Sequence, residues 1–90
     1  MRKQARLYIK GEVIGVGFRS WINHQTKLTN IKGWVRNVGN EVEVLLQGEE
    51  KDIKEMIKRI KKGPPISNVD AIETTWEKPN PIHSSFEILK

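Results

Sequence analysis

The sequence of 90 residues contains no cysteine, few aromatic residues (7%) and no long apolar run. Without cysteine it has neither disulfides nor thiolate chemistry, which suits a reducing compartment. No segment approaches the ~20 consecutive apolar residues of a membrane span, and no apolar stretch of signal-peptide length follows the basic start. We therefore expect one domain over residues 1–90, located in the cytoplasm and without a membrane partner.

The overall charge is positive. Sixteen Lys and Arg residues stand against 11 Asp and Glu residues, which gives a formal net charge of +5. This balance favours anionic ligands, but it does not choose between a small phosphate and a polynucleotide. Many of the lysines fall within residues 51–62, where the solvated face of one helix explains them.

Hydrophobic periodicity predicts three strands and one helix in the first half of the chain. Apolar and polar side chains alternate over residues 5–14, as in a half-buried strand. The apolar spacing over residues 20–29 is that of a helix, and Asn30 is a suitable left-handed stop for it. Residues 31–37 and 42–46 have strand composition and flank a Gly-Asn hairpin turn.

The clearest element of the second half is a surface helix whose apolar residues recur at i, i+3, i+4 and i+7 from Ile53. A Gly-Pro-Pro segment from Gly63 stops it, and strands over residues 69–76 and 85–89 follow. The resulting order predicts an α+β fold. We expect a ferredoxin-like βαββαβ sandwich in which two helices cover one face of an antiparallel sheet, with a short C-terminal strand.

The stretch from Gly11 to Trp21 contains the strongest candidate for a binding site. Gly15 and Gly17 lie between the predicted strand and helix, where glycine lets successive amide N–H groups point into one anion-binding concavity. A Gly-x-Gly before a helix can also be a simple tight turn. Arg19 favours the functional interpretation, because a cation at a helix N-terminus opposes the helix dipole unless an anion lies between them.

A second candidate is Asn37, which ends the predicted second strand just before the turn. Asparagine is common there for purely local reasons as well. Gly33 in the same strand indicates a bulge or a close approach of another backbone. In a βαβ unit the loop after the first strand can lie beside the adjoining strand. Asn37 could then face the anion-binding loop, with a side chain able to accept from and donate to a water molecule.

Other kinds of chemistry have little support in the sequence. His24 and His83 are far apart and have no ligand-like spacing to carboxylates, so no metal is predicted. Nothing marks a base that would activate Ser20. Glu41 and Glu43 lie on one side of the third strand, which we expect to face solvent. The glycine loop matches neither a dinucleotide fingerprint nor a P-loop, so no cofactor is predicted.

Two motifs resemble those of acylphosphatases, small enzymes that hydrolyse acyl phosphates. The first, Gly-x-Val-Gln-Gly-Val-x-Phe-Arg, is matched by Gly11, Val13, Gly15, Val16, Phe18 and Arg19. The second, Gly-aromatic-Val-Lys/Arg-Asn, is matched by Gly33, Trp34, Val35, Arg36 and Asn37. The resemblance covers essentially the whole chain, and the family fold, a βαββαβ sandwich, agrees with the predicted order. Ile14 departs from the family's usual glutamine.

The resemblance implies hydrolysis of the carboxyl-phosphate bond to a carboxylate and inorganic phosphate. Arg19 and Asn37 are the implied catalytic residues, the first holding the phosphoryl group and the second orienting the attacking water. The implied phosphate-binding residues are Ile14, Gly15, Val16, Gly17, Phe18 and Arg19. The partner is then a small-molecule acyl phosphate, and inorganic phosphate is both product and inhibitor. Nothing in the sequence calls for more than a monomer.

Two alternatives stay open. Residues 7–11 resemble the first-strand signature of an RNA recognition motif, but such domains need stacking aromatics on strand three. Residues 41–46 are acidic there and lack an aromatic, which argues against a nucleic-acid partner. The other alternative is a non-catalytic acylphosphatase-like domain of a larger maturation protein. The short chain and the complete motifs favour a stand-alone enzyme.

Overall fold

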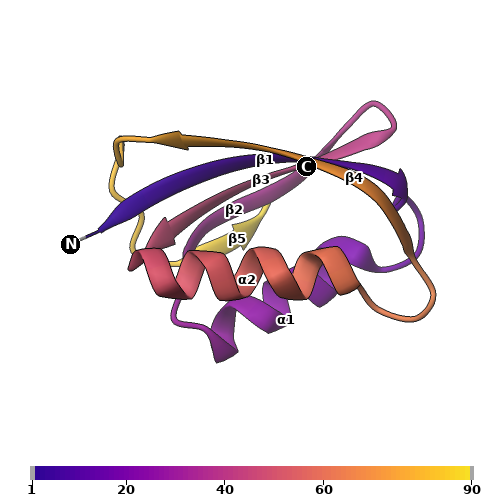
Figure 1. The fold of residues 1–90 in the computed structure, drawn as a ribbon, viewed down its shortest axis with the longest axis horizontal. Coiled ribbons are helices and arrows are strands. Elements are labelled where there is room, and N and C mark those ends of the chain that lie inside the picture. The colour runs from indigo at the N-terminus through magenta and orange to yellow at the C-terminus, as the bar shows by residue number, and fades with distance from the viewer. Residues whose placement is uncertain (1, 90) are drawn as a thin grey trace.

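The computed structural model describes residues 2–89, which form two helices and five strands in the predicted order (Figure 1). Every predicted element is present, with ends that differ by a few residues. In chain order the elements are β1 (Lys3–Glu12), α1 (Phe18–Leu28), β2 (Lys32–Val38), β3 (Glu41–Gly48), α2 (Glu50–Lys62), β4 (Asn68–Glu77) and β5 (Phe86–Ile88).

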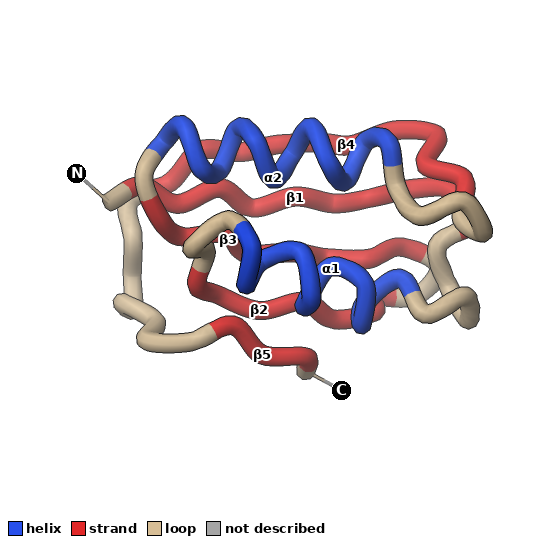
Figure 2. Tube along the Cα trace, turned by 90° about the horizontal axis from the view of Figure 1, so that it is seen from below, coloured by secondary structure: helices blue, strands red, loops and turns tan. Residues whose placement is uncertain are grey.

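The sheet has the strand order β4-β1-β3-β2-β5. The first four strands pair antiparallel, which confirms the ferredoxin-like arrangement. β5 instead pairs parallel to β2, so the sheet is mixed. This direction follows from the connection between β4 and β5, because β4 finishes at the same end of the sheet at which β2 starts. The connection passes along this end of the sheet, and β5 then starts beside the start of β2 and runs parallel to it (Figure 2).

Both helices cover the same face of the sheet (Figure 1). α1 packs over β2 and β5, and α2 packs over β4, β3 and β1. The core between the layers is apolar, and each large side chain buried there contributes about 1.5–3 kcal/mol. Its fully buried members include Leu7, Ile9, Phe18, Ile22, Leu46, Ile53, Met56 and Ile60. Within the described residues no helix is long and apolar enough to cross a membrane.

Backbone conformation confirms two details predicted from the sequence. Asn30 follows α1 in the left-handed conformation, with φ of 55°. Gly33 marks a close backbone approach, because a Cβ at this position would collide with the carbonyl oxygen of Leu45 on β3. The strand that carries Asn37 is therefore held tightly against β3.

The face of the sheet opposite the helices carries an ion-pair network around Glu43. Glu43 lies on the predicted face of the sheet, but the expectation that it is exposed to solvent there is wrong, since it is only 2% exposed. Its carboxylate accepts hydrogen bonds from Arg6 (2.6 Å), Arg36 (2.8 Å) and Tyr8 (3.1 Å). Tyr8 and Arg36 are its direct neighbours in the sheet register, and these long side chains cover it.

Glu41, the other acid on this side of the strand, is half-buried at the start of β3. The network determines the charge state of Glu43. Burial by itself raises the pKa of the Glu43 carboxyl, but the hydrogen bonds from Arg36, Arg6 and Tyr8 outweigh it and hold the pKa below its ordinary 4.5. A lowered pKa means that Glu43 stabilises the fold above the pKa of the unfolded chain. This contribution is lost as the pH falls through the lower, folded pKa.

Candidate active site

The glycine-rich loop joins β1 to α1 over residues 13–17. Val13 and Phe18 are each 1% exposed and fix the two ends of the loop in the core. Gly15 and Gly17 have φ of 75° and 74°, in the left-handed region that disfavours other residues. A Cβ at either position would meet nothing within 4 Å, so the backbone conformation and not lack of space requires glycine. Left-handed residues in a turn can form an anion-binding concavity.

α1 begins without a cap. Gly17 precedes it with φ of 74° and ψ of 19°, no side chain caps its amides, and its first turn has no acidic residue. The amide of Trp21 donates to the carbonyl of Gly17 at 3.0 Å, so the regular helical ladder starts there. The amides before it have no partner within the helix, and they lie at the positive end of its dipole. Such an N-terminus is suited to an anion.

These residues surround a hollow of about 110 Å³, lined by Val13, Gly15, Gly17, Phe18, Arg19, Ser20 and Ile88. Pockets for drug-sized ligands span roughly 300–1,000 Å³. The hollow therefore suits a group of phosphate size and not a nucleotide.

Four of the six predicted loop residues line the hollow, and two do not. Val16 packs against the core instead, and Ile14 is 40% exposed. Arg19 is half-buried, and its guanidinium forms no hydrogen bond or ion pair with any other residue in the described range 2–89. The cation at the start of α1 is thus available to a ligand.

Asn37 lies at the same end of the sheet as the loop. It pairs with Val42 of β3, which also pairs with Ile9 of β1, so one strand separates Asn37 from the end of β1. Val35, two residues earlier, is buried under the helices, and Asn37 therefore points to the same face. Its Oδ1 is buried and has no hydrogen-bond partner in the part of the chain that the structure describes. An unpaired buried acceptor costs about 1–3 kcal/mol, so this oxygen is suited to receive a hydrogen bond from a water or ligand.

β5 contacts both the strand that carries Asn37 and the hollow that Arg19 lines. Ile88 pairs with Val35 of the Asn37 strand and also lines the hollow next to Arg19. Arg19 and Asn37 are therefore brought to the same face and the same end of the sheet. Ile88 was missed in the sequence, because no local signal says which strand a three-residue segment joins.

Of the remaining sequence candidates, the two histidines lie away from the hollow. His24 is exposed on α1, and the amide of His83 donates to Oε1 of Gln47 at 2.8 Å, near the beginning of β2. Ser20 lines the hollow but is exposed. Within residues 2–89 no cluster of three or more His, Cys, Asp or Glu side chains could hold a metal ion.

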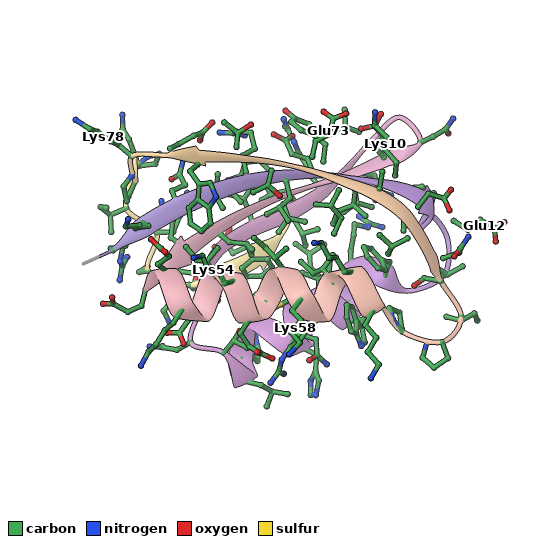
Figure 3. The ribbon with its side chains drawn as sticks, in the orientation of Figure 1. Lys10, Glu12, Lys54, Lys58, Glu73 and Lys78 are labelled. Atoms are coloured by element: carbon green, nitrogen blue, oxygen red, sulfur yellow. The ribbon has the colours of Figure 1, made fainter. Side chains whose placement is uncertain are left out.

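A larger hollow of about 580 Å³ lies at the opposite end of β1. Lys54 of α2 and Lys78 beyond β4 border it (Figure 3). Its Glu50 is paired with Lys3 at 2.8 Å and with Lys54 at 2.9 Å. This hollow contains none of the residues predicted for the site, and three of its charged side chains are paired with one another.

Comparison with known sequences identifies the family. The acylphosphatase family model matches residues 5–88. The acylphosphatase of Caldivirga maquilingensis is 42% identical over 72 residues, which are 78% of this chain and 76% of that protein. The protein named "Probable carbamoyltransferase HypF" of Methanocaldococcus jannaschii is 37% identical over 100% of this chain, but the chain spans only 12% of its length.

Comparison with solved structures agrees. The crystal structure of acylphosphatase from Bacillus subtilis superimposes with a TM-score of 0.94 at 32% identity, covering 100% of both chains. Full-length HypF in its phosphate- and nucleotide-bound form superimposes with a TM-score of 0.93 at 31% identity, covering 100% of this chain and 12% of that one. Sequence, fold and motifs lead to one conclusion: this chain belongs to the acylphosphatase family of enzymes.

Proposed function

We propose that the protein hydrolyses the carboxyl-phosphate bond of acyl phosphates, with Arg19 and the loop amides holding the phosphoryl group and Asn37 orienting the attacking water. Family membership supports the reaction class. The observation that carries the assignment of residues is the small hollow at the uncapped start of α1, lined by an Arg19 that has no partner within residues 2–89.

Binding follows from charge and shape. The phosphoryl group brings negative charge to the positive end of the α1 dipole, where unpaired amides can donate to its oxygens. The planar fork of the Arg19 guanidinium donates two parallel hydrogen bonds to the same group. The anion also relieves the repulsion between Arg19 and the helix dipole. Residues 14–19 supply the backbone amides of this site.

Hydrolysis needs little more than positioning. The buried Oδ1 of Asn37 accepts a hydrogen bond from water and holds it for attack on phosphorus. As the new P–O bond forms, the bond to the acyl oxygen breaks and its electron pair leaves with the carboxylate. A carboxylate is a good leaving group and needs no acid. Within residues 2–89 the side chains lining the hollow include no strong base, so a phosphate oxygen takes the proton of the water.

The experiment is hydrolysis of benzoyl phosphate by the wild type and by Asn37→Ala. We expect the variant to lose at least ~10²-fold in kcat, the scale for removing a positioning or charge-stabilising group. Asn40→Ala is the matched control, because Asn40 is an exposed asparagine in the adjacent turn. An inactive wild type, or an Asn37→Ala variant as active as Asn40→Ala, contradicts the proposal.

The RNA-binding alternative is weakened by the open face of the sheet. Trp34, the aromatic on β2, lies under two guanidiniums, those of Arg6 at 5.7 Å and Arg36 at 5.1 Å from its ring. The hydroxyl of Tyr8 on β1 donates to Glu43. Base stacking needs free aromatic faces, and here the guanidiniums compete for the Trp34 ring.

The likeness to HypF supports a second candidate, in which this chain acts as one domain of a larger carbamoyl-transferring protein. Carbamoyl phosphate assayed beside benzoyl phosphate distinguishes the two, because this candidate requires preference for the carbamoyl compound. Under the main proposal the protein acts as a monomer in the cytoplasm. Inorganic phosphate, the product, then inhibits by competing for the same hollow.

A further inference from the structure

We infer that Ile88 forms an apolar wall for the acyl group, so that the site prefers acyl phosphates with an apolar acyl group over those with a polar one. The inference rests on the proposed function and names the substrate class for the same hollow. It starts from the small size of the hollow. At about 110 Å³ it accommodates the phosphoryl group but not the rest of the substrate, so the acyl group has to cross the rim.

Among the described residues that line the hollow, one offers an acyl group an exposed apolar side chain. Val13 and Phe18 are buried in the core, and Gly15 and Gly17 have no side chains. The last two lining residues, Arg19 and Ser20, are polar. Ile88, the remaining lining residue, is 40% exposed.

β5 holds Ile88 in place. Its neighbour Leu89 donates its amide to the carbonyl of Val35 at 2.8 Å, and Ile88 itself pairs with Val35 in the parallel register. Phe86, two residues earlier on the same face, packs against the core. Ile88 is therefore a fixed part of the rim, contributed from the far end of the chain.

The preference follows from burial. An acyl group can rotate about the bonds that join it to phosphorus, and it gains free energy where it removes apolar surface from water. A benzoyl group gains this against Ile88. A carbamoyl group does not, because its N–H groups would lose hydrogen bonds to water against an aliphatic side chain. Partial cover of one half-exposed isoleucine corresponds to a selectivity of about 3- to 10-fold.

The test compares kcat/KM for benzoyl phosphate and carbamoyl phosphate in the wild type, Ile88→Thr and Ile88→Ala. Threonine keeps the β-branched shape that suits the strand, so it serves if alanine loosens β5. We expect the benzoyl-to-carbamoyl ratio to fall by about 3- to 10-fold in both variants. Glu87→Ala is the matched control, because Glu87 lies on the same strand but points to the opposite face.

Three outcomes separate the inference from the proposed function. A ratio that falls in the Ile88 variants and not in Glu87→Ala supports the inference. A ratio unchanged in folded Ile88→Thr, or lowered equally in Glu87→Ala, overturns it while hydrolysis itself still stands. A wild type that hydrolyses neither substrate overturns the proposed function, and the inference with it.

Discussion

α1 begins at Phe18 with no acidic residue in its first turn, whereas α2 begins at Glu50 and carries Asp52 two residues later. Both helices place a cation second, Arg19 in α1 and Lys51 in α2. Neither start has a side-chain cap hydrogen bond. In α2 the two acids balance the positive end of the dipole and the cation beside it, and in α1 nothing within the first turn does so.

Under the proposed function, this difference makes the start of α2 structural and leaves the start of α1 to a ligand. Glu50 forms ion pairs with Lys3 and Lys54, so this acid at the start of α2 already has partners within the protein. At the start of α1 the glycine loop keeps the surface open. Under the proposed function, the absence of an acid, together with the glycines and Arg19, makes the start of α1 the one that binds the ligand.

The largest expected effect comes from removing the cation from each helix start. Arg19→Ala should reduce benzoyl phosphate hydrolysis by at least ~10²-fold, because a charge fixed beside the phosphoryl group is lost. Lys51→Ala, the same change at the equivalent position of α2, should leave the rate unchanged. Steady-state assays of both variants check this. Similar losses of activity in the two variants would show that the two helix starts do not differ in function.

A smaller effect is expected from making α1 resemble α2. Ser20 is the third residue of α1, as Asp52 is of α2, so Ser20→Glu adds the missing acid. The carboxylate should raise the free energy of unfolding by about 0.3–1 kcal/mol through the helix dipole. It should also weaken inorganic phosphate binding by about tenfold or more through like-charge repulsion.

Thermal unfolding with and without inorganic phosphate measures both consequences of Ser20→Glu. A ligand that binds only the folded state raises the midpoint, and at a fixed ligand concentration tighter binding raises it further. The variant should start from a higher midpoint and gain less from phosphate than the wild type. An undiminished gain would place the phosphate site away from the start of α1.

The smallest effect concerns acid stability at the start of α2. Hydrogen bonds from Lys3 and then Lys54 lower the pKa of Glu50 from 4.5 to about 2. A lowered folded pKa gives stability above pH 4.5 that is lost as the pH falls toward 2. Glu50→Gln should therefore show a smaller loss of thermal stability across this window than the wild type. The effect is small because the pair is exposed and screened by solvent.

Glu12→Gln is the control for the acid experiment, because it makes the same change of charge at an exposed site at the end of β1 (Figure 3). Unfolding midpoints measured from pH 5 to pH 2 compare the three proteins. If Glu50→Gln loses as much stability as Glu12→Gln over this range, the ion pairs of Glu50 do not stabilise the start of α2.

Sequence patterns were sufficient for the features that depend on neighbours along the chain. Periodicity of 2 or 3.6 predicted the strands and helices, and glycine and asparagine marked the left-handed positions. The position of Arg19 at a helix start could also be predicted from residues near it in the sequence. Asn37 was harder, because its place at the same end of the sheet as the loop depends on the strand order, and the structure adds an Oδ1 with no hydrogen-bond partner among residues 2–89.

What could not be predicted depends on contacts between distant segments. Alternation gave the face on which Glu43 lies, but not that Arg6 and Arg36 of neighbouring strands would cover it. The parallel pairing of β5, and with it the place of Ile88 on the rim, depends on a connection across the end of the sheet. Ile14, where the family usually has glutamine, is exposed on the loop, and nothing in the structure explains the substitution.

The central claim is that the start of α1, and not that of α2, binds the phosphoryl group. Titration of inorganic phosphate into ¹⁵N-labelled protein tests it most directly, because each backbone amide reports separately. We predict saturable shifts for the amides of residues 14–20, no comparable shifts for residues 50–53, and loss of the effect in Arg19→Ala. Shifts centred on α2, or amides 14–20 that do not respond, would contradict the account.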